Sequence, residues 1–184
     1  MRPVSFVIGV PTESLRGEKR VAATPESIQK FLARGLKVRV EKGAGLAAGI
    51  ADEAYVAAGA EVVDDAWGSD AVFKVRPPTQ DEAAKLKEGA LLVSLIQPAS
   101  NPGLVEALAA RRATVLALEK VPRVTRAQKM DVLSSMANLS GYRAVVEAAA
   151  HYQGFFSGQM TAAGATPPAK VLVIGAGVAG LAAV

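Results

Sequence analysis

The first 119 residues alternate between short apolar runs and segments with helix signals, and this alternation restricts the fold more than any other feature. Strands are expected at 4–10 (VSFVIGV), 36–41 (LKVRVE), 60–63 (AEVV), 71–75 (AVFKV), 90–96 (ALLVSLI) and 113–119 (ATVLALE). Strands that alternate with helices at this spacing predict right-handed crossovers and a parallel sheet covered on both faces. The sequence therefore predicts an α/β, Rossmann-like (flavodoxin-like) N-terminal lobe.

Capping residues mark where the helices between these strands begin and end. Thr24 stands before Pro25, an N-cap followed by a proline at the first helical position. Thr79 and Glu82 form a capping box that predicts a helix over 80–88. The remaining predicted boundaries are Gly35 after the first helix, Asp52 and Gly59 around the second, and Asn101-Pro102 at the start of helix 102–112.

The pattern changes near Asp131. Residues 134–156 lack proline and are rich in helix formers, so a helix of roughly 23 residues and about 35 Å is expected. Residues 157–170 (SGQMTAAGATPPAK) are expected to form a Gly/Pro-rich linker. The predicted organisation is an N-terminal lobe (1–130), a connecting helix and linker (131–165), and the first strand and glycine turn of a truncated second Rossmann lobe (166–184).

The sequence KVLVIGAGVAGLAAV (residues 170–184) matches the G-x-G-x-x-G fingerprint of dinucleotide-binding folds. Gly175 would permit the tight turn, Gly177 the approach of a pyrophosphate, and Gly180 close packing of helix and strand. The N–H groups of Val178 and Ala179 would then meet the anion. An apolar strand before the glycines and helix formers after them are the context that this motif requires.

Two further observations qualify the fingerprint. GAGLAA at 43–48 matches the same pattern, but Gly49 follows it, so a loop is expected there. The acidic residue that would hold the ribose should lie about 20 positions beyond the glycines, which is past Val184. We therefore interpret the chain as a fragment, and expect residues 166–184 either to be poorly ordered or to pair with another copy.

Composition excludes several classes of function. The chain has no cysteine and a single histidine, His151, so neither a disulfide framework nor a metal site is expected. The net charge of +4 is scattered, which argues against nucleic-acid binding. No apolar run approaches the roughly 20 residues that span a bilayer, and residues 1–11 are typical of a strand and not of a signal peptide.

Polar side chains gather between the last predicted strand of the first lobe and the long helix. Arg123 could pair with a phosphate or an amide oxygen, and Asp131 and Ser134 could hold a carboxamide. They lie beyond a strand's carboxyl end, where open α/β sheets bind ligands. The alternative is that Asp131 or Ser134 only caps the following helix.

The chain resembles the NAD(H)-binding domain in the α subunit of proton-translocating nicotinamide nucleotide transhydrogenases, and is more distantly similar to alanine dehydrogenases. The matching segments follow the family order along the whole chain: GVPTES, EKRVAATP, FKVRPP, QPASNP, PRVTRAQKMDVLSSMANLSGYRAV and PPAKVLVIGAGVAGLAA. The resemblance implies direct hydride transfer from NADH to NADP⁺ bound on a partner domain, with NADP(H) held there, coupled to proton translocation by a membrane subunit.

The same resemblance assigns residues and partners. Arg123, Asp131 and Ser134 would position the nicotinamide of NAD(H), while Gln128 would reach toward the NADP site; Gln128 and Asp131 are the candidate catalytic residues. The first lobe would form one wall of the cofactor cleft. A homodimer is implied, located in the cytoplasm and held at the inner face of the membrane through its partner subunits.

One position separates the two relatives. Arg20 and Lys74 match residues that alanine dehydrogenases use, but Gln97 stands where those enzymes have a histidine. Reductive amination needs a group that titrates near neutrality, whereas hydride exchange between two nicotinamides needs only placement and exclusion of water. Transhydrogenase is therefore favoured. The alternatives are an alanine dehydrogenase-like oxidoreductase and a dimerisation module only, and the isolated fragment is expected to be inactive.

Overall fold

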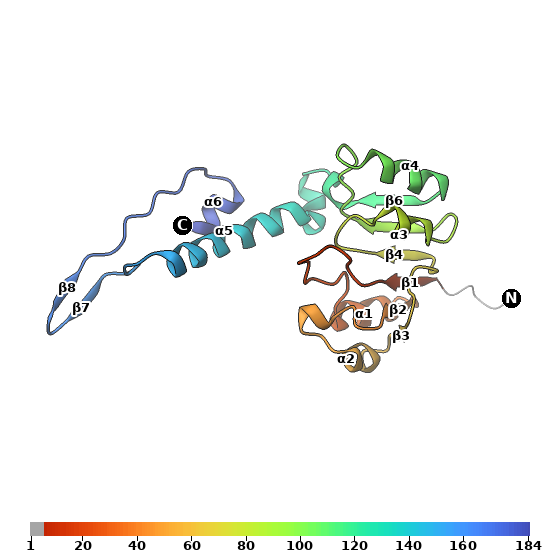
Figure 1. Ribbon diagram of the computed structural model, residues 1–184, viewed down its shortest axis with the longest axis horizontal. Helices are drawn as coiled ribbons and strands as arrows, with labels where there is room; N and C mark the ends of the chain where they lie inside the picture. Colours follow the sequence, from red (N-terminus) through yellow and green to blue (C-terminus); the bar gives the residue numbers. More distant parts are fainter. Residues whose placement is uncertain (1–5) are drawn as a thin grey trace. The chain divides into compact units, whose positions relative to one another are not determined.

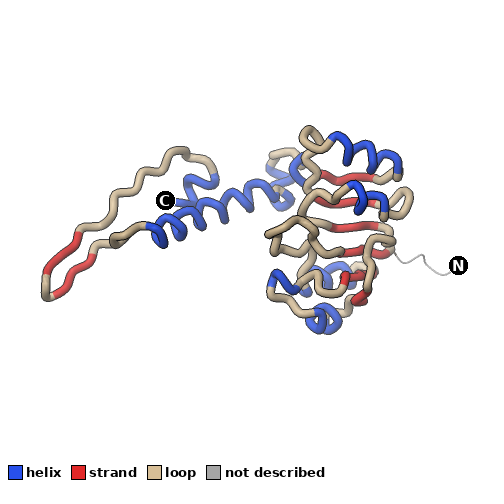
Figure 2. Tube along the Cα trace, in the orientation of Figure 1, coloured by secondary structure: helices blue, strands red, loops and turns tan. Residues whose placement is uncertain are grey.

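The computed structural model describes residues 6–184, which divide into two compact units. The sheet unit extends to Val121, and the helical unit comprises Pro122–Val184. Figure 1 follows the chain through both, and Figure 2 separates helices, strands and loops. The two units meet in sequence at the start of the polar loop that carries the candidate site residues.

The sheet unit is built on six parallel strands in the order β3-β2-β1-β4-β5-β6. They are β1 (Val7–Val10), β2 (Lys37–Glu41), β3 (Glu61–Val63), β4 (Ala71–Phe73), β5 (Leu91–Ser94) and β6 (Thr114–Ala117). This is the strand order of Rossmann folds and differs from the flavodoxin order. The Rossmann-like α/β prediction is confirmed. Residues 4 and 5 of the predicted first strand lie outside the described residues.

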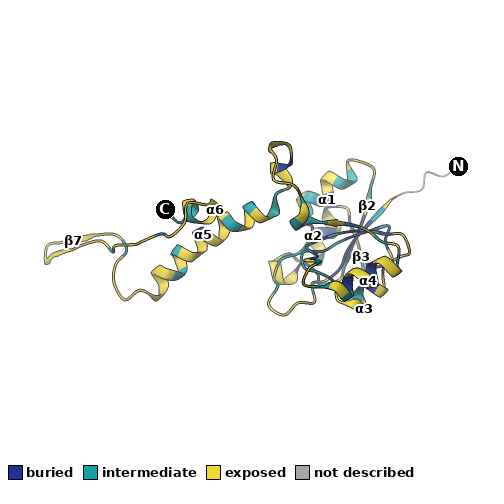
Figure 3. Ribbon diagram, turned by 90° about the horizontal axis from the view of Figure 1, so that it is seen from above, coloured by how far each residue is buried: buried dark blue, intermediate teal, exposed yellow. Residues whose placement is uncertain are grey.

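Helices cover both faces of this sheet, as the sequence predicted (Figure 1). Ile28 and Tyr55 of the first two helices pack with Ile8 in one buried cluster, and Leu104 packs with Leu92 in the other. Figure 3 shows the buried residues concentrated between the sheet and its helices. The helices are α1 (Pro25–Leu32), α2 (Asp52–Ala57), α3 (Gln80–Ala84) and α4 (Pro102–Ala110).

Two predicted helix starts are confirmed in atomic detail. Thr24 is the N-cap of α1, and its hydroxyl oxygen accepts from the backbone N–H of Ser27. Thr79 accepts from the N–H of Glu82 at 3.1 Å, and the Glu82 carboxylate accepts from the N–H of Thr79 at 2.8 Å. Local side-chain chemistry was sufficient to locate these two boundaries because capping involves only neighbouring residues.

The prediction that Asp52 caps the second helix was wrong. Ala51 is the N-cap and Asp52 the first helical residue. The Asp52 carboxylate instead accepts from the backbone N–H of Gly43 at 2.9 and 3.1 Å. The GAGLAA segment is a turn with a short 3₁₀ helix η1 (Leu46–Ala48), as expected of a loop. The amide that donates to Asp52, the N–H of Gly43, belongs to the first residue of the segment.

Two other helices differ from their predictions. Helix α3 ends at Ala84 and not at residue 88, because Leu86 turns into the core and is fully buried. Asn101 occupies the N-cap position of α4, but its side chain makes no capping hydrogen bond. Its amide donates instead to the carbonyl oxygens of Ile96 and Gln97.

The helical unit follows β6 and the short 3₁₀ helix η2 (Leu118–Lys120). Its longest element is α5, which is exposed along most of its length (Figure 3). The predicted linker contains an exposed antiparallel hairpin that the sequence analysis missed, because its glycines and prolines favoured a linker. The elements are η3 (Thr125–Met130), α5 (Val132–His151), β7 (Gln159–Thr161), β8 (Gly164–Thr166) and α6 (Val178–Ala183).

The strand predicted before the glycine turn does not form. Residues 171–174 have no strand assignment, and Leu172 and Ile174 are 83% and 92% exposed. A strand needs a neighbour to pair its backbone groups, and β7 and β8 in this unit pair only with each other. Apolar, β-branched composition was therefore insufficient to make this segment a strand.

Ion pairs fix the long loop after β1 across the carboxyl edge of the sheet. The fully buried ammonium of Lys74 lies 3.7 Å from Glu13 and 3.3 Å from Glu82. It also lies 5.4 Å from the centre of the Trp67 ring. The Glu13 carboxylate accepts from the backbone N–H groups of Val75 (2.6 Å) and its neighbour Arg76 (3.2 Å). Opposite charges and amides thus compensate each buried charge.

A second carboxylate in the loop, Glu18, pairs with two arginines. It accepts from Arg20 at 2.6 Å and from Arg76 at 2.7 Å. The hydrogen bond from Arg20 is the main reason that the pKa of Glu18 is lowered from 4.5 to about 2. The loop is therefore anchored to β4 by charges that are paired at neutral pH.

Replacing Leu92 with alanine is expected to destabilise the sheet unit by about 2–5 kcal/mol, because Leu92 is fully buried in β5 and alanine leaves a cavity. Leu116→Ala on the adjacent strand is the matched control and should cost only about 0.5 kcal/mol, since Leu116 is 54% exposed. Urea unfolding followed by circular dichroism measures both values. Equal losses in the free energy of unfolding for the two variants would contradict the packing described for Leu92.

The Glu18 ion pairs should make stability depend on acid pH. A lowered folded-state pKa stabilises the fold above pH 4.5, and this contribution is lost as pH falls from 4.5 toward 2. Glu18→Gln should therefore be less stable than the wild type at pH 6, and the gap should close by about pH 2. Denaturant unfolding across this pH range measures the free energy of unfolding of both proteins, with exposed Glu53→Gln as the control. A difference in free energy of unfolding that does not change with pH would count against the ion pairs.

Candidate functional site

A cavity of about 510 Å³ lies within the helical unit, where the polar loop meets the start of α5. Its volume is in the range of small-molecule sites. All four loop residues singled out from the sequence line it, together with the first residue of α6. The lining residues are Arg123, Val124, Thr125, Gln128, Asp131, Ser134, Ser135 and Val178.

Asp131 and Ser134 form one hydrogen-bonded group at the start of α5. Asp131 is the N-cap, and its carboxylate accepts from the Ser134 backbone N–H at 3.0 Å and from the Ser134 hydroxyl at 2.6 Å. The hydroxyl hydrogen bond is the largest cause of a lowered pKa at Asp131, so this carboxyl is ionised at neutral pH. A carboxylate has about four acceptor positions, and with the backbone N–H of Leu133 as a third donor one remains for a ligand.

Arg123 and Gln128 come from the same loop. Arg123 also contributes to lowering the pKa of Asp131 through its positive charge. Arg126 and Lys129, from the same basic segment, are exposed and do not line the cavity. The sequence analysis missed Thr125 and Ser135, for which the only available signal was their position beside residues already selected.

The glycine turn approaches this cavity through one residue. Gly177 is the N-cap of α6, and Val178, the next residue, lines the cavity. Gly175, Ala179 and Gly180 are not among the lining residues. Gly175 has φ of +116°, a conformation that favours glycine.

Close packing explains two glycines in this unit. A Cβ at Gly180 would lie 1.9 Å from the carbonyl oxygen of Gly175, so the turn folds tightly onto α6. A Cβ at Gly141 of α5 would lie 2.0 Å from the carbonyl oxygen of Ala179. Only glycine therefore allows α6 to lie this close to α5, which brings Val178 to the loop.

The groups around the cavity suit the nicotinamide end of a dinucleotide. A carboxamide presents N–H donors and one carbonyl oxygen, which match the Asp131 carboxylate and the Arg123 guanidinium respectively. The Ser134 hydroxyl oxygen is a further acceptor, since its proton is donated to Asp131. Arg123 also suits a phosphate. The residues present therefore fit this part of the cofactor. Within residues 6–184, no cluster of His, Cys, Asp and Glu side chains is arranged to hold a metal ion.

The sheet unit has the strand order of a nucleotide-binding fold, but one of its own side chains lies at the switch point, which is where the strand order reverses. Ligands of such sheets bind where the strand order reverses, here beyond β1 and β4. Glu13 bonds the two amides there, and Lys74 lies beneath it with paired charge. The carboxylate of Glu13 thus takes up these two backbone amides.

Two models of one protein family match consecutive parts of the chain. The N-terminal domain model of alanine dehydrogenase/PNT matches residues 9–140, and the C-terminal domain model of the same family matches residues 144–184. No helix in residues 6–184 has the length and apolarity to cross a bilayer.

The most similar relatives include transhydrogenase subunits. NAD(P) transhydrogenase subunit alpha of Haemophilus influenzae is 56% identical over 97% of this chain, which spans 35% of that protein. The same subunit of Cereibacter sphaeroides is 53% identical, with 96% of this chain and 35% of that protein covered. Alanine dehydrogenase of Methanococcus maripaludis is 35% identical, over 95% and 48%. The chain thus spans between a third and a half of these relatives.

Solved structures give the same ranking. A transhydrogenase from Sinorhizobium meliloti superposes with a TM-score of 0.93 at 45% identity, covering 96% of this chain and 54% of that one. An L-alanine dehydrogenase gives 0.83 at 30% identity, over 97% and 50%. These matches extend through both units in sequence. The chain therefore belongs to the alanine dehydrogenase/PNT family.

Proposed function

We propose that this chain supplies part of the NAD(H)-binding site of a proton-translocating transhydrogenase. The reaction moves a hydride from C4 of NADH to C4 of NADP⁺, giving NAD⁺ and NADPH. The observation that carries the proposal is the cavity in which Arg123, Gln128, Asp131 and Ser134 meet the first residue of α6. The higher identity to transhydrogenase subunits than to alanine dehydrogenases supports it.

Each loop residue has a distinct task in this proposal. Asp131 accepts the N–H of the nicotinamide carboxamide, and its ionised state makes it a strong acceptor. Arg123 donates to the carboxamide oxygen or a phosphate, and the Ser134 hydroxyl oxygen accepts from the carboxamide N–H, because its own proton is donated to Asp131. Gln128 extends toward NADP(H) on the partner domain. The turn Gly175-Ala176-Gly177, with the amides of Val178 and Ala179 and the close packing at Gly180, holds the pyrophosphate.

Placement of the two rings, and not proton transfer, is what these residues contribute. A direct hydride transfer between nicotinamides adds or removes no proton on the substrate, so no residue must titrate near pH 7. Positioning alone provides a large part of such catalysis when water is excluded. Gln97, three residues beyond β5, has no titratable group, which disfavours the amination of a keto acid.

The proposal includes partners. NADP(H) binds to a second domain, and a membrane subunit couples the hydride step to proton movement. The chain acts in the cytoplasm as a homodimer, bound at the inner face of the membrane through those subunits. An alanine dehydrogenase-like activity is the competing assignment, and the reaction tested below separates the two.

Arg123→Ala is expected to lower kcat/KM for transfer from NADH to NADP⁺ by about 10–100-fold, because a charged hydrogen bond to the cofactor is lost. The matched control is Arg126→Ala, three residues along the loop and outside the cavity, which should stay within about twofold. The assay uses the assembled enzyme and follows NADPH formation.

Two results would count against this assignment. Equal activity of the Arg123→Ala variant and the wild type would remove Arg123 from the site. Formation of NADH from NAD⁺ and alanine by the assembled enzyme, without NADP-dependent transfer, would favour an alanine dehydrogenase-like function instead.

The 184-residue chain alone is expected to bind NADH weakly and to be inactive, because residues 171–174 form no strand and α6 has only six residues. NADH fluorescence titration of this chain and of a full-length α subunit measures the difference. We expect fast amide exchange over 166–184 in the same sample. Micromolar binding, or strong concentration-independent protection of 166–184, would contradict this.

A further inference from the structure

Gly141 stands in the middle of α5, the longest helix of residues 6–184, where glycine is an unfavourable residue. Glycine destabilises a helix interior relative to alanine because it loses more backbone freedom on folding. Helix α5 is described in full over its 20 residues, and Gly141 is its one buried residue. The helix is thus covered at a position where it has no side chain.

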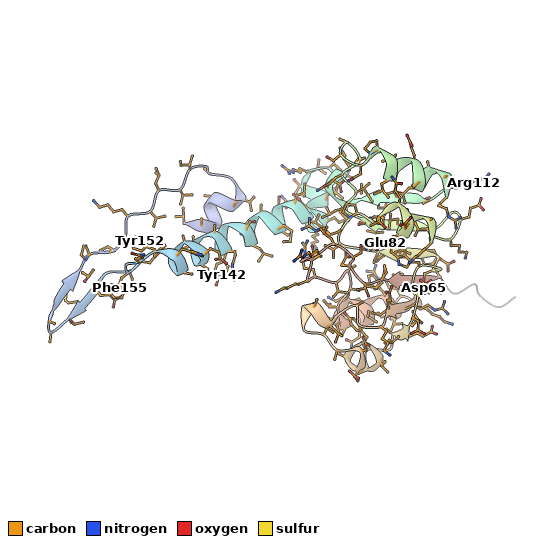
Figure 4. All side chains as sticks on the ribbon, viewed as in Figure 1. Asp65, Glu82, Arg112, Tyr142, Tyr152 and Phe155 are labelled. Atoms are coloured by element: carbon orange, nitrogen blue, oxygen red, sulfur yellow. The ribbon has the colours of Figure 1, made fainter. Side chains whose placement is uncertain are left out.

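Helix α6 is the element that covers Gly141. Figures 1 and 3 both show α6 beside α5, and the two helices pack against each other within the helical unit. A Cβ added at Gly141 would meet three backbone atoms of Ala179: the carbonyl oxygen, the carbonyl carbon and, at 3.0 Å, the Cα. Tyr142, the next residue, is 64% exposed and projects into solvent (Figure 4), so its side of α5 is not covered.

This contact fixes the separation of the two helices. All three atoms that the Cβ would meet belong to the backbone, so no rotation of a side chain can make room for it. A Cβ in ordinary van der Waals contact lies about 3.4 Å or more from its neighbours. With alanine at position 141, the start of α6 would therefore have to move away from α5 by about 1 Å.

Ser134 lies on the same face of α5 as Gly141, two turns nearer the polar loop. It precedes Gly141 by seven residues, which corresponds to roughly 10 Å along the helix axis. Asp131, the N-cap of α5, accepts from the Ser134 hydroxyl at 2.6 Å. One helix thus carries both the groups that suit a carboxamide and the position against which α6 packs.

The glycine turn is attached to the start of α6. Gly177 is the N-cap, and Val178, the next residue, lines the cavity together with Asp131 and Ser134. Ala179, whose backbone lies against Gly141, follows directly. The depth at which α6 packs on α5 therefore sets how far the turn lies from the loop residues.

A dinucleotide must reach both places at once. In the proposed function, Asp131 and Ser134 bind the nicotinamide carboxamide, and the glycine turn binds the pyrophosphate of the same molecule. Two linked groups strengthen each other's binding only when their sites lie at the separation that the linkage allows. A misplacement of about 1 Å is enough to lose much of this gain.

We propose that Gly141 is a positioning residue for the cofactor, which sets the distance between the nicotinamide-binding loop and the pyrophosphate-binding turn so that one NAD(H) molecule contacts both. This inference rests on the proposed function. Gly141 touches no cofactor; its missing side chain lets α6 pack at the required depth.

Gly141→Ala in a full-length α subunit tests this spacing. We expect the Kd for NADH to rise about 10–100-fold, because the two ends of the cofactor no longer fit their sites together. ADP-ribose has the pyrophosphate but no nicotinamide, so its Kd should stay within about twofold of the wild-type value. Isothermal titration calorimetry measures both ligands.

Ser140→Ala is the matched control. It changes an exposed residue in the same turn of α5 and also raises helix propensity, but it adds no atom. Both ligands should keep their wild-type Kd within about twofold. Far-UV circular dichroism should show a helix content at or above that of the wild type for both variants, because alanine favours the helix.

Different results would overturn the inference and the proposed function. Unchanged NADH affinity in Gly141→Ala would mean that the spacing does not depend on this residue. An equal loss of NADH and ADP-ribose affinity, or a loss of helix content, would make Gly141 a folding residue only. Either result, with a wild type that binds both ligands, overturns only the inference; a wild-type subunit that binds neither ligand overturns the proposed function together with it.

Discussion

Parallel pairing of neighbouring strands is the constraint on which the sheet unit depends. Because the strands run in one direction, the residues that follow β1, β4, β5 and β6 all lie at one edge. This places Glu13 beside Lys74 and Glu119 beside Gln97, although each pair is far apart in sequence. Polar groups at this edge are therefore held partly by charged residues that follow other strands.

The two units differ in whether their loop backbone amides already have a carboxylate partner. In the sheet unit, the switch point between β1 and β4 is closed by the carboxylate of Glu13, which bonds the amides of Val75 and Arg76. In the helical unit, the glycine turn leaves the first residue of α6 beside an open cavity. Rossmann strand order in one unit and the Rossmann fingerprint in the other thus occur in a single chain.

Local chemistry explains which sequence predictions agreed with the structure. The cap at Thr24 and the capping box of Thr79 and Glu82 involve residues three apart, so the sequence contains everything they require. Asp52 and Asn101 looked equally good as caps, but their side chains bond Gly43 and the Ile96–Gln97 segment instead. Those partners lie four to nine positions away in the same connection between strand and helix, beyond the three-residue spacing of a cap, and the resulting bonds replaced the predicted ones.

The sequence alone determined the α/β alternation and the parallel sheet covered on both faces, because periodicity and capping are read within a few positions. Tertiary structure alone decided that 171–174 is no strand, since pairing requires a neighbour that composition cannot supply. It also decided that the carboxylate of Glu119 would accept from the backbone N–H of Gln97, because that contact exists only where two parallel strands end together.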